Sequence, residues 1–323
     1  MGNGGGRREL ARHMSGGAIS SPGFSPTYEL PPNPRETTAA IDEVLDDHLD
    51  SIRPSRAEEK LLGEMKDWVA STLSSELTLE QVNVVGSVAK RTQNRRKAGN
   101  DIDVVFILNE KVHGNWLTQE NGPRNCLSKV RDALASRLRM SDIKTDRNTV
   151  TGRVGDKKID VIPAFRHPEG GIWIPDTSGR QKWIRTNPRL SKRLLEERDR
   201  QWNGQVTKII RLAKDLNEKN GGILTSTHIE ATVTAHLDTR PSGAEKSLRA
   251  SFHEYVARLP WLLQRPAYEE VYHQRVDEYL TPKERDRAIA WARRAASKVE
   301  RAEKIARRGL PDQAADAYQE VLE

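Results

Sequence analysis

The stretch that decides the fold is Val84-Val85-Gly86-Ser87, followed after a basic loop by Asn100-Asp101-Ile102-Asp103-Val104-Val105-Phe106-Ile107-Leu108. An apolar run ends in a Gly-Ser turn, and a second apolar run opens with two carboxylates two residues apart. Because the side chains of a strand alternate between its two faces, Asp101 and Asp103 share one face and the apolar residues between and after them point into a core. Two adjacent carboxylates repel each other, and hard cations such as Mg²⁺ prefer their oxygens. The stretch therefore predicts a cation site, although Asp-x-Asp alone would also fit a hairpin with two solvated aspartates.

The Gly-Ser turn before the carboxylates suits a phosphate group. Glycine lets the backbone approach a ligand closely, and a helix starting at Ser87 would offer free N–H groups to an anion. Phosphate held beside a carboxylate-bound Mg²⁺ is the arrangement that phosphoryl transfer requires. Gly86 and Ser87 are therefore candidate phosphate-binding residues.

A third carboxylate lies in a predicted hairpin. Residues 150–154 and 157–163 alternate like two strands joined by a two-residue turn. Asp160 faces away from its apolar neighbours, where a charged side chain is rarely buried without a partner. If this strand lies beside the strand of Asp101 and Asp103, three carboxylates converge. They could then hold two metal ions, which lie roughly 3.5–4 Å apart in two-metal sites.

Together these residues resemble a known active site. Gly86-Ser87, Asp101-x-Asp103 and Asp160 are similar to the catalytic motif of the polymerase-β-type nucleotidyltransferase superfamily. Later segments resemble the CD-NTases, the bacterial relatives of cyclic GMP–AMP synthase and of the oligoadenylate synthetases. These segments are Ile174-Pro175-Asp176 and residues 183–188, 206–214 and 224–230. The resemblance runs from about Ala39 to the end of the chain.

The resemblance implies an α+β fold. A polymerase-β-type nucleotidyltransferase core, with a small mixed sheet backed by helices, would be joined to a C-terminal helical domain. The molecule would be bilobed, with the active site in the cleft. We expect residues 1–36, which are rich in Gly, Ser and Pro, to be a disordered tail. Residues 37–168 would then be the catalytic core and residues 169–323 the helical domain that completes the nucleotide pocket.

The resemblance also implies an activity. The chain would join ribonucleoside triphosphates into a cyclic di- or trinucleotide second messenger, with release of pyrophosphate, in bacterial anti-phage signalling of the CBASS type. Asp101, Asp103 and Asp160 would bind two Mg²⁺ ions, with Mn²⁺ as a substitute, and Gly86 and Ser87 would bind phosphates. The alternative is a template-independent nucleotidyltransferase that modifies RNA or protein, like an oligoadenylate synthetase or a tailing enzyme. A non-catalytic binding subunit is a third reading, against which the presence of all three carboxylates argues.

Lys214 and Ser226 are assigned to nucleotide binding by the resemblance alone. On position alone, Lys214 reads as a surface lysine beside an apolar helical stripe. Thr227-x-x-Glu230 fits a capping box, so helix capping explains the segment of Ser226 without a ligand. The two roles are compatible, because a capped helix N-terminus can also face a phosphate.

Composition fits a cytoplasmic enzyme. The 323 residues carry a net charge of +7, which suits nucleoside triphosphates as well as nucleic acid. The single cysteine, Cys126, excludes an internal disulfide and a cysteine-based zinc site. We see no apolar run long enough to cross a membrane and no signal peptide.

We expect a monomer that binds ribonucleoside triphosphates and acts on a downstream effector through its product. Some members of the family need an activating protein or nucleic acid. One basic cluster, residues 90–97, could steer triphosphates to the site. A second, residues 189–200, is interleaved with acidic residues and predicts a solvated helix face.

Overall fold

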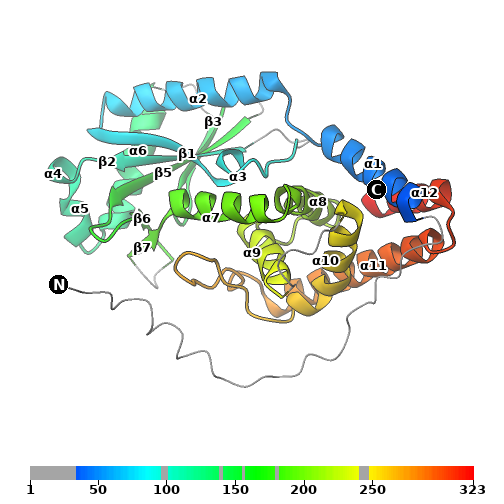
Figure 1. Cartoon of the computed structure of the whole chain (residues 1–323). Helices are drawn as coiled ribbons and strands as arrows, with labels where there is room; N and C mark the ends of the chain where they lie inside the picture. The colour runs from blue at the N-terminus through cyan, green and yellow to red at the C-terminus, as the bar shows by residue number, and fades with distance from the viewer. Residues whose placement is uncertain (1–33, 96–100, 138–140, 155–156, 179–181, 240–246) are drawn as a thin grey trace, which may run out of the picture.

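A sheet with helices packed on it lies at one end of the chain's structure, and a group of helices lies at the other (Figure 1). The computed structural model describes residues 34–95, 101–137, 141–154, 157–178, 182–239 and 247–323. The predicted disordered tail, residues 1–36, lies outside the described residues up to residue 33. From Pro34 onward the chain is helical, so the first helix starts earlier than the predicted tail ends.

The sheet is mixed, as predicted. In their order across the sheet, its strands are β1 (Leu79–Val85), β2 (Asp101–Leu108), β5 (Lys157–Arg166), β4 (Val150–Val154) and β3 (Ser141–Thr145). β2 and β5 are parallel, whereas β1 with β2, β4 with β5 and β3 with β4 are antiparallel. β6 (Ile172–Pro175) and β7 (Trp183–Thr186) extend from the end of β5. These two strands lie in the part of the chain that was predicted to be mainly helical. They form strands because their β-branched and aromatic side chains favour that structure.

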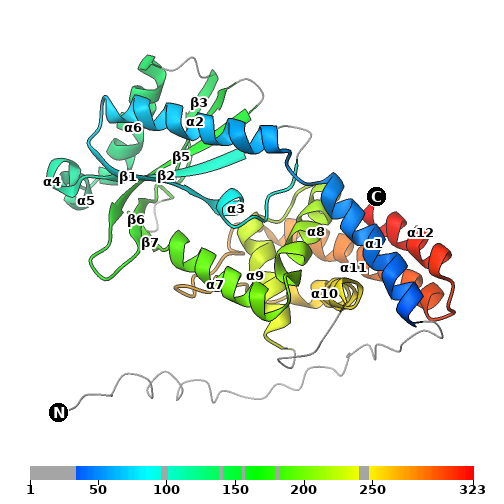
Figure 2. The ribbon, with the colours of Figure 1, turned by 45° about the horizontal axis from the view of Figure 1, so that its top comes forward.

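One face of the sheet is buried under helices, as strand alternation predicts. α2 (Arg56–Ser74) and α6 (Gly122–Arg137) pack on it (Figure 2). Ile102, Val104 and Phe106 of β2 are at most 1% exposed there. α2 begins with a capping box at Ser55. Three short helices, α3 (Gly86–Ala89), α4 (Glu110–His113) and α5 (Asn115–Thr118), connect the strands and helices of this part.

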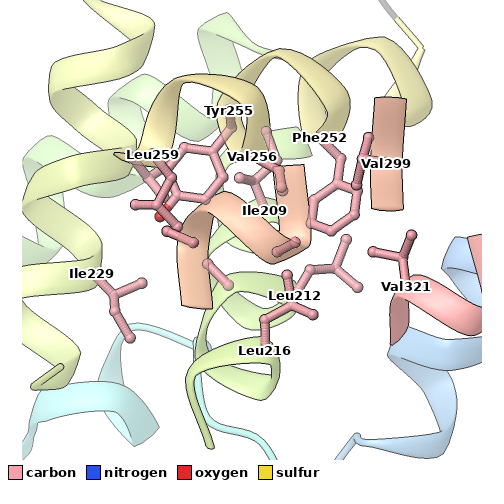
Figure 3. Packing of buried hydrophobic residues seen from close by; sticks show 14 of the residues in the cluster. Ile209, Leu212, Leu216, Ile229, Phe252, Tyr255, Val256, Leu259, Val299 and Val321 are labelled. Carbon is pink, nitrogen blue, oxygen red and sulfur yellow. The ribbon is translucent and has the colours of Figure 1, made fainter. Parts of the chain in front are cut away.

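The C-terminal half is helical, as predicted. Its helices are α7 (Pro188–Gln201), α8 (Gln205–Lys219), α9 (Ser226–Leu237), α10 (Leu248–Leu262), α11 (Pro282–Ala306) and α12 (Pro311–Leu322). Their apolar side chains form a second core, part of which is drawn in Figure 3. α1 (Pro34–Ser51) joins this core rather than the sheet, through Ile41, Leu45 and Leu49. The division into domains at residues 36 and 168 stays a prediction.

A buried charge network ties α1 to this helical core. The guanidinium of Arg249 is fully buried and donates two hydrogen bonds of 2.9 Å to the carboxylate of Glu303. Tyr318 donates to the same carboxylate, and Arg249 also donates to the hydroxyl of Thr38 and, through its backbone N–H, to Asp42. Burial raises the pKa of Glu303, but hydrogen bonds from Arg249 and Tyr318 outweigh it, so the pKa is lowered. The network therefore holds α1, α10, α11 and α12 together.

His228, in the first turn of α9, makes stability depend on pH. Its ring is fully buried, and Nδ1 lies 3.1 Å from the hydroxyl of Tyr279. Burial lowers the pKa of His228 to about 4; Asp277 opposes this shift and Arg285 adds to it. The unfolded chain takes up the proton near pH 6.5, so the contribution of the neutral ring to the free energy of unfolding is fully present above that pH. Up to about 3 kcal/mol is then lost as the pH falls toward 4.

We expect His228→Gln to remove most of this acid sensitivity. Melting temperatures of wild type and variant, measured by circular dichroism from pH 7.5 to 4.5, test the expectation. As the pH falls, the melting temperature of the variant should decrease less than that of wild type. An equal loss in both proteins across this range would show that His228 does not carry the effect.

No helix of the described residues is long and apolar enough to span a membrane.

Candidate active site

The parallel pairing of β2 and β5 brings two of the predicted carboxylates side by side. In the register of this pair, Asp103 lies opposite Asp160, and Asp101 lies opposite Lys158. Residues opposite each other in neighbouring strands point to the same face, and such strands are about 4.8 Å apart. Asp103 and Asp160 therefore lie side by side on the face of the sheet that α2 and α6 do not cover. The side chain of Asp101 lies outside the described residues, so its predicted place beside them stays a prediction.

The Gly-Ser turn closes against Asp103. β1 ends at Val85, which pairs with Asp103, and Gly86 follows with a φ of +65°, in the left-handed region that favours glycine. A Cβ atom at Gly86 would lie 2.1 Å from Oδ2 of Asp103, so no other residue fits without a shift. Ser87 follows in α3, which is a single helical turn. The turn and the carboxylate therefore lie in direct contact.

Both oxygens of Asp160 have hydrogen-bond partners. Thr151, on the neighbouring strand β4, donates its hydroxyl to Oδ1 at 2.5 Å. Lys158, two residues earlier on β5, donates its ammonium to Oδ2 at 2.6 Å. The side chain of Asp160 is 13% exposed and that of Lys158 is 32% exposed. Asp160 is thus a mostly enclosed carboxylate whose charge is paired with that of a lysine.

Carboxylates at the strand ends are the oxygen donors that Mg²⁺ prefers. Oδ2 of Asp103 lies against the backbone of Gly86, so a cation bound to this carboxylate would lie next to the Gly-Ser turn. In the described part of the chain, no three His, Cys, Asp or Glu side chains gather as a metal site. The predicted convergence of three carboxylates therefore stays a prediction, to which Asp103 and Asp160 contribute a matching pair.

Lys214 belongs to a buried ion cluster behind the Gly-Ser turn. Its ammonium lies 3.1 Å from Oε1 of Glu230 and 3.0 Å from the hydroxyl of Thr92. Lys90 donates to the other oxygen of Glu230 at 2.7 Å. Burial raises the pKa of Glu230, but the charges of Lys214 and Lys90 and their hydrogen bonds outweigh it, so the pKa is lowered. Lys214 is 8% exposed, so the expectation of a surface lysine was wrong.

Glu230 does not cap α9. The helix begins with Thr225 as its N-cap, whose hydroxyl accepts a hydrogen bond from the backbone N–H of His228. The predicted capping box of Thr227 and Glu230 is therefore wrong, because Glu230 pairs with lysines from α8 and from the segment after α3. Ser226 is the first residue of α9 and is half-buried.

A cavity of about 430 Å³ extends from the Gly-Ser turn along the same side of the sheet. Residues of β1 and β2 form one side of it, and residues at the start of α7 form another. The cationic side chains that line it are Lys90, Arg166, Arg189 and Lys192. Val105 and Ile107, which follow Asp103 at alternate positions of β2, line its floor. The cavity therefore combines an apolar floor with cationic side chains, a lining that suits a nucleotide. Lys90, Arg166 and Lys192 are also ion-paired with glutamates, with which a phosphate would compete.

The basic cluster of residues 189–200 was predicted to be a solvated helix face, and this is only partly right. Arg193 forms an exposed i,i+4 ion pair with Glu197, as predicted. Arg189 and Lys192 instead line the cavity, and Arg198 is only 15% exposed. The spacing of three between Arg189 and Lys192 places both on one helix face, a signal that the sequence already carried.

Comparison with known proteins identifies the kind of domain. Residues 40–199 match the family model described as the Second Messenger Oligonucleotide or Dinucleotide Synthetase domain, abbreviated SMODS. The chain is also 25% identical, over 154 residues, to a cyclic AMP-AMP-AMP synthase from an Acinetobacter species. That alignment covers 45% of this chain and 41% of the relative, so it spans less than half of either protein.

Solved structures resemble the chain over most of its length. E. coli MS115-1 CdnC, in a complex with HORMA-deltaN, matches with a TM-score of 0.63 at 14% identity. The match covers 86% of this chain and 96% of CdnC. Vibrio cholerae DncV, a cyclic AMP-GMP synthase in complex with a linear intermediate, matches with a TM-score of 0.57 at 12% identity over 86% of this chain and 87% of DncV. These likenesses confirm the predicted fold class.

Proposed function

Residues 40–199 are a SMODS domain, which places the chain among the CD-NTases, and from this we propose that it joins ribonucleoside triphosphates into a cyclic oligonucleotide. The product would be a cyclic di- or trinucleotide second messenger, formed with release of pyrophosphate in CBASS-type anti-phage signalling. The observation that carries the proposal is the register of β2 and β5. It pairs Asp103 with Asp160 directly beside the glycine turn.

Asp101, Asp103 and Asp160 are the residues that would hold two Mg²⁺ ions. Two features support this assignment: carboxylate oxygens are the donors that Mg²⁺ prefers, and the register of β2 and β5 sets Asp103 directly opposite Asp160. Bound there, the metal would neutralise the triphosphate and lower the pKa of the acceptor ribose hydroxyl. Mn²⁺ offers the same chemistry as a substitute.

Gly86 and Ser87 would hold the β- and γ-phosphates. The left-handed backbone at Gly86 turns the chain sharply at the end of β1, next to Asp103. The hydroxyl of Ser87 and the backbone N–H groups of the turn are donors suited to phosphate oxygens. Correct alignment of the triphosphate with the acceptor hydroxyl would supply much of the acceleration.

Lys214 and Ser226 would contact the nucleotide from the helical part. Lys214 is already paired with Glu230, so a nucleotide phosphate would have to compete with that carboxylate for the ammonium. Lys90 belongs to the same cluster and also lines the cavity, so it is better placed than Lys214 to contact a ligand there. Ser226, at the start of α9, would donate its hydroxyl from the opposite side.

Partners of two kinds are proposed. The E. coli CdnC structure contains a HORMA protein, which motivates the proposal that this chain too has an activating protein or nucleic acid. A downstream effector would recognise the cyclic product. We propose that the chain acts in the cytoplasm as a monomer.

The test is an incubation with all four radiolabelled ribonucleoside triphosphates and Mg²⁺ or Mn²⁺, followed by phosphatase and chromatography. We expect a small phosphatase-resistant product from wild type and none from Asp101→Asn/Asp103→Asn. Omitting one nucleotide at a time identifies the bases. Label found in added RNA or protein, without a small product, would instead support a template-independent transferase. Turnover by the double variant equal to that of wild type would contradict the site assignment.

A further inference from the structure

Lys158 places a positive charge on the carboxylate that is proposed to bind a metal. Its ammonium lies 2.6 Å from Oδ2 of Asp160, while Oδ1 accepts the hydroxyl of Thr151. The two oxygens are thus held by different kinds of donor. Thr151 lies on a neighbouring strand and orients Oδ1, whereas Lys158 is a flexible side chain that neutralises Oδ2.

The strand geometry explains why this lysine reaches the site. Lys158 and Asp160 are two residues apart on β5, so their side chains leave the same face of the sheet. In the register with β2, Lys158 lies opposite Asp101 and Asp160 lies opposite Asp103. The backbone of Lys158 therefore lies among the residues to which the metals are assigned. Its neighbour Lys157 faces the other side and is 9% exposed.

An ammonium and a divalent cation compete for Oδ2 at close range. Mg²⁺ binds oxygen ligands at about 2.0–2.1 Å, and the ammonium stands only slightly farther from the same oxygen. Two cations this close repel each other strongly in a partly enclosed site. The side chain of Lys158 is 32% exposed and has a flexible four-carbon stem, so its ammonium can exchange Oδ2 for another acceptor.

We propose that Lys158 is the resident counter-cation of Asp160 and is displaced from Oδ2 when a divalent cation binds. The inference rests on the proposed function, because it takes Asp160 as a metal ligand. Thr151 keeps Oδ1 in place during the exchange. Lys158 thereby weakens metal binding to Asp160 in the nucleotide-free protein.

The experiment measures Mn²⁺ binding to the full chain without nucleotide, by electron paramagnetic resonance of the free ion. We compare wild type with Lys158→Met, Lys158→Gln and Lys158→Arg. Loss of the charge in the first two variants should tighten Mn²⁺ binding by about tenfold, and the arginine variant should stay near wild type. Lys111→Met removes the same charge from an exposed position on α4 and should change nothing.

The same titrations on Asp160→Asn, alone and combined with Lys158→Met, separate the role of Lys158 from the assignment of Asp160 as a metal ligand. Tighter binding by the neutral variants that disappears with Asp160→Asn supports the inference. Unchanged or weaker binding by the neutral variants, with binding still lost in Asp160→Asn, overturns the role of Lys158 but leaves the metal site intact. Binding that Asp160→Asn does not alter in either background overturns both the inference and the assignment of Asp160. Circular dichroism spectra confirm that each variant is folded.

Discussion

Asp103→Asn is expected to lower the rate of product formation by about a thousandfold or more, with little effect on folding. Asparagine has nearly the same size as aspartate, so it fits against Gly86 as the wild-type side chain does. It lacks the negative charge, and loss of one electrostatic group acting on the reacting centre costs about 10²–10³ in rate. A carboxylate that is also a metal ligand contributes at least as much. The rate is measured with labelled triphosphates at saturating Mg²⁺.

The matched control for this variant is Asp132→Asn. Asp132 lies on α6, which packs on the face of the sheet opposite to Asp103. It is 62% exposed and pairs with its neighbour Arg131. Its replacement should leave the rate within about twofold of wild type, because exposed ion pairs contribute little. If Asp103→Asn kept a tenth or more of the wild-type rate, Asp103 would not be a metal ligand.

Arg249→Met is expected to lower the free energy of unfolding by about 3–5 kcal/mol, because it leaves the carboxylate of Glu303 buried without its cation. Both side chains are completely buried, and the pair is bidentate. The same network joins α1 to α10, α11 and α12, so the variant should loosen α1 as well. Urea unfolding followed by circular dichroism at pH 7.5 measures the loss.

A second variant separates the charge from the packing. Arg249→Met/Glu303→Leu/Tyr318→Phe replaces the ion pair and its tyrosine donor by apolar groups and should recover most of the lost stability, as buried ion pairs often can be replaced in this way. Arg301→Met, which removes an exposed cation of α11 that pairs with Glu320, should cost less than about 1 kcal/mol. A loss below about 1 kcal/mol for Arg249→Met would show that the buried pair contributes little.

Local alternation was enough to predict the strand that carries the carboxylates. Ile102, Val104 and Phe106 are buried and Asp103 faces the other side, because a strand of period two has no other way to arrange them. For Gly86 the sequence predicted a close backbone approach to a ligand, and the structure adds a left-handed turn packed on Asp103. Only a residue without a Cβ allows the left-handed turn against a carboxylate.

Contacts between distant segments could not be predicted in the same way. The capping box expected for Glu230 fits the local sequence, yet the carboxylate pairs with Lys90 and Lys214, which are 140 and 16 residues away. Lys214 likewise looked like a surface residue on its own helix. Arg189 and Lys192 belong to a run whose sequence resembles a solvated helix face. They line the cavity because the start of α7 lies against the sheet. In each case the deciding neighbour lies on another element.

The sequence by itself therefore determined which residues could serve a metal-dependent nucleotidyltransferase and on which face of their strand they stand. Only the tertiary structure decided that β5 lies parallel to β2 with Asp160 opposite Asp103, and that Lys158 neutralises Asp160. The physical reason is that a strand's periodicity follows from its own backbone. The choice of a neighbouring strand and its register depends instead on how distant apolar faces pack, which no local pattern records.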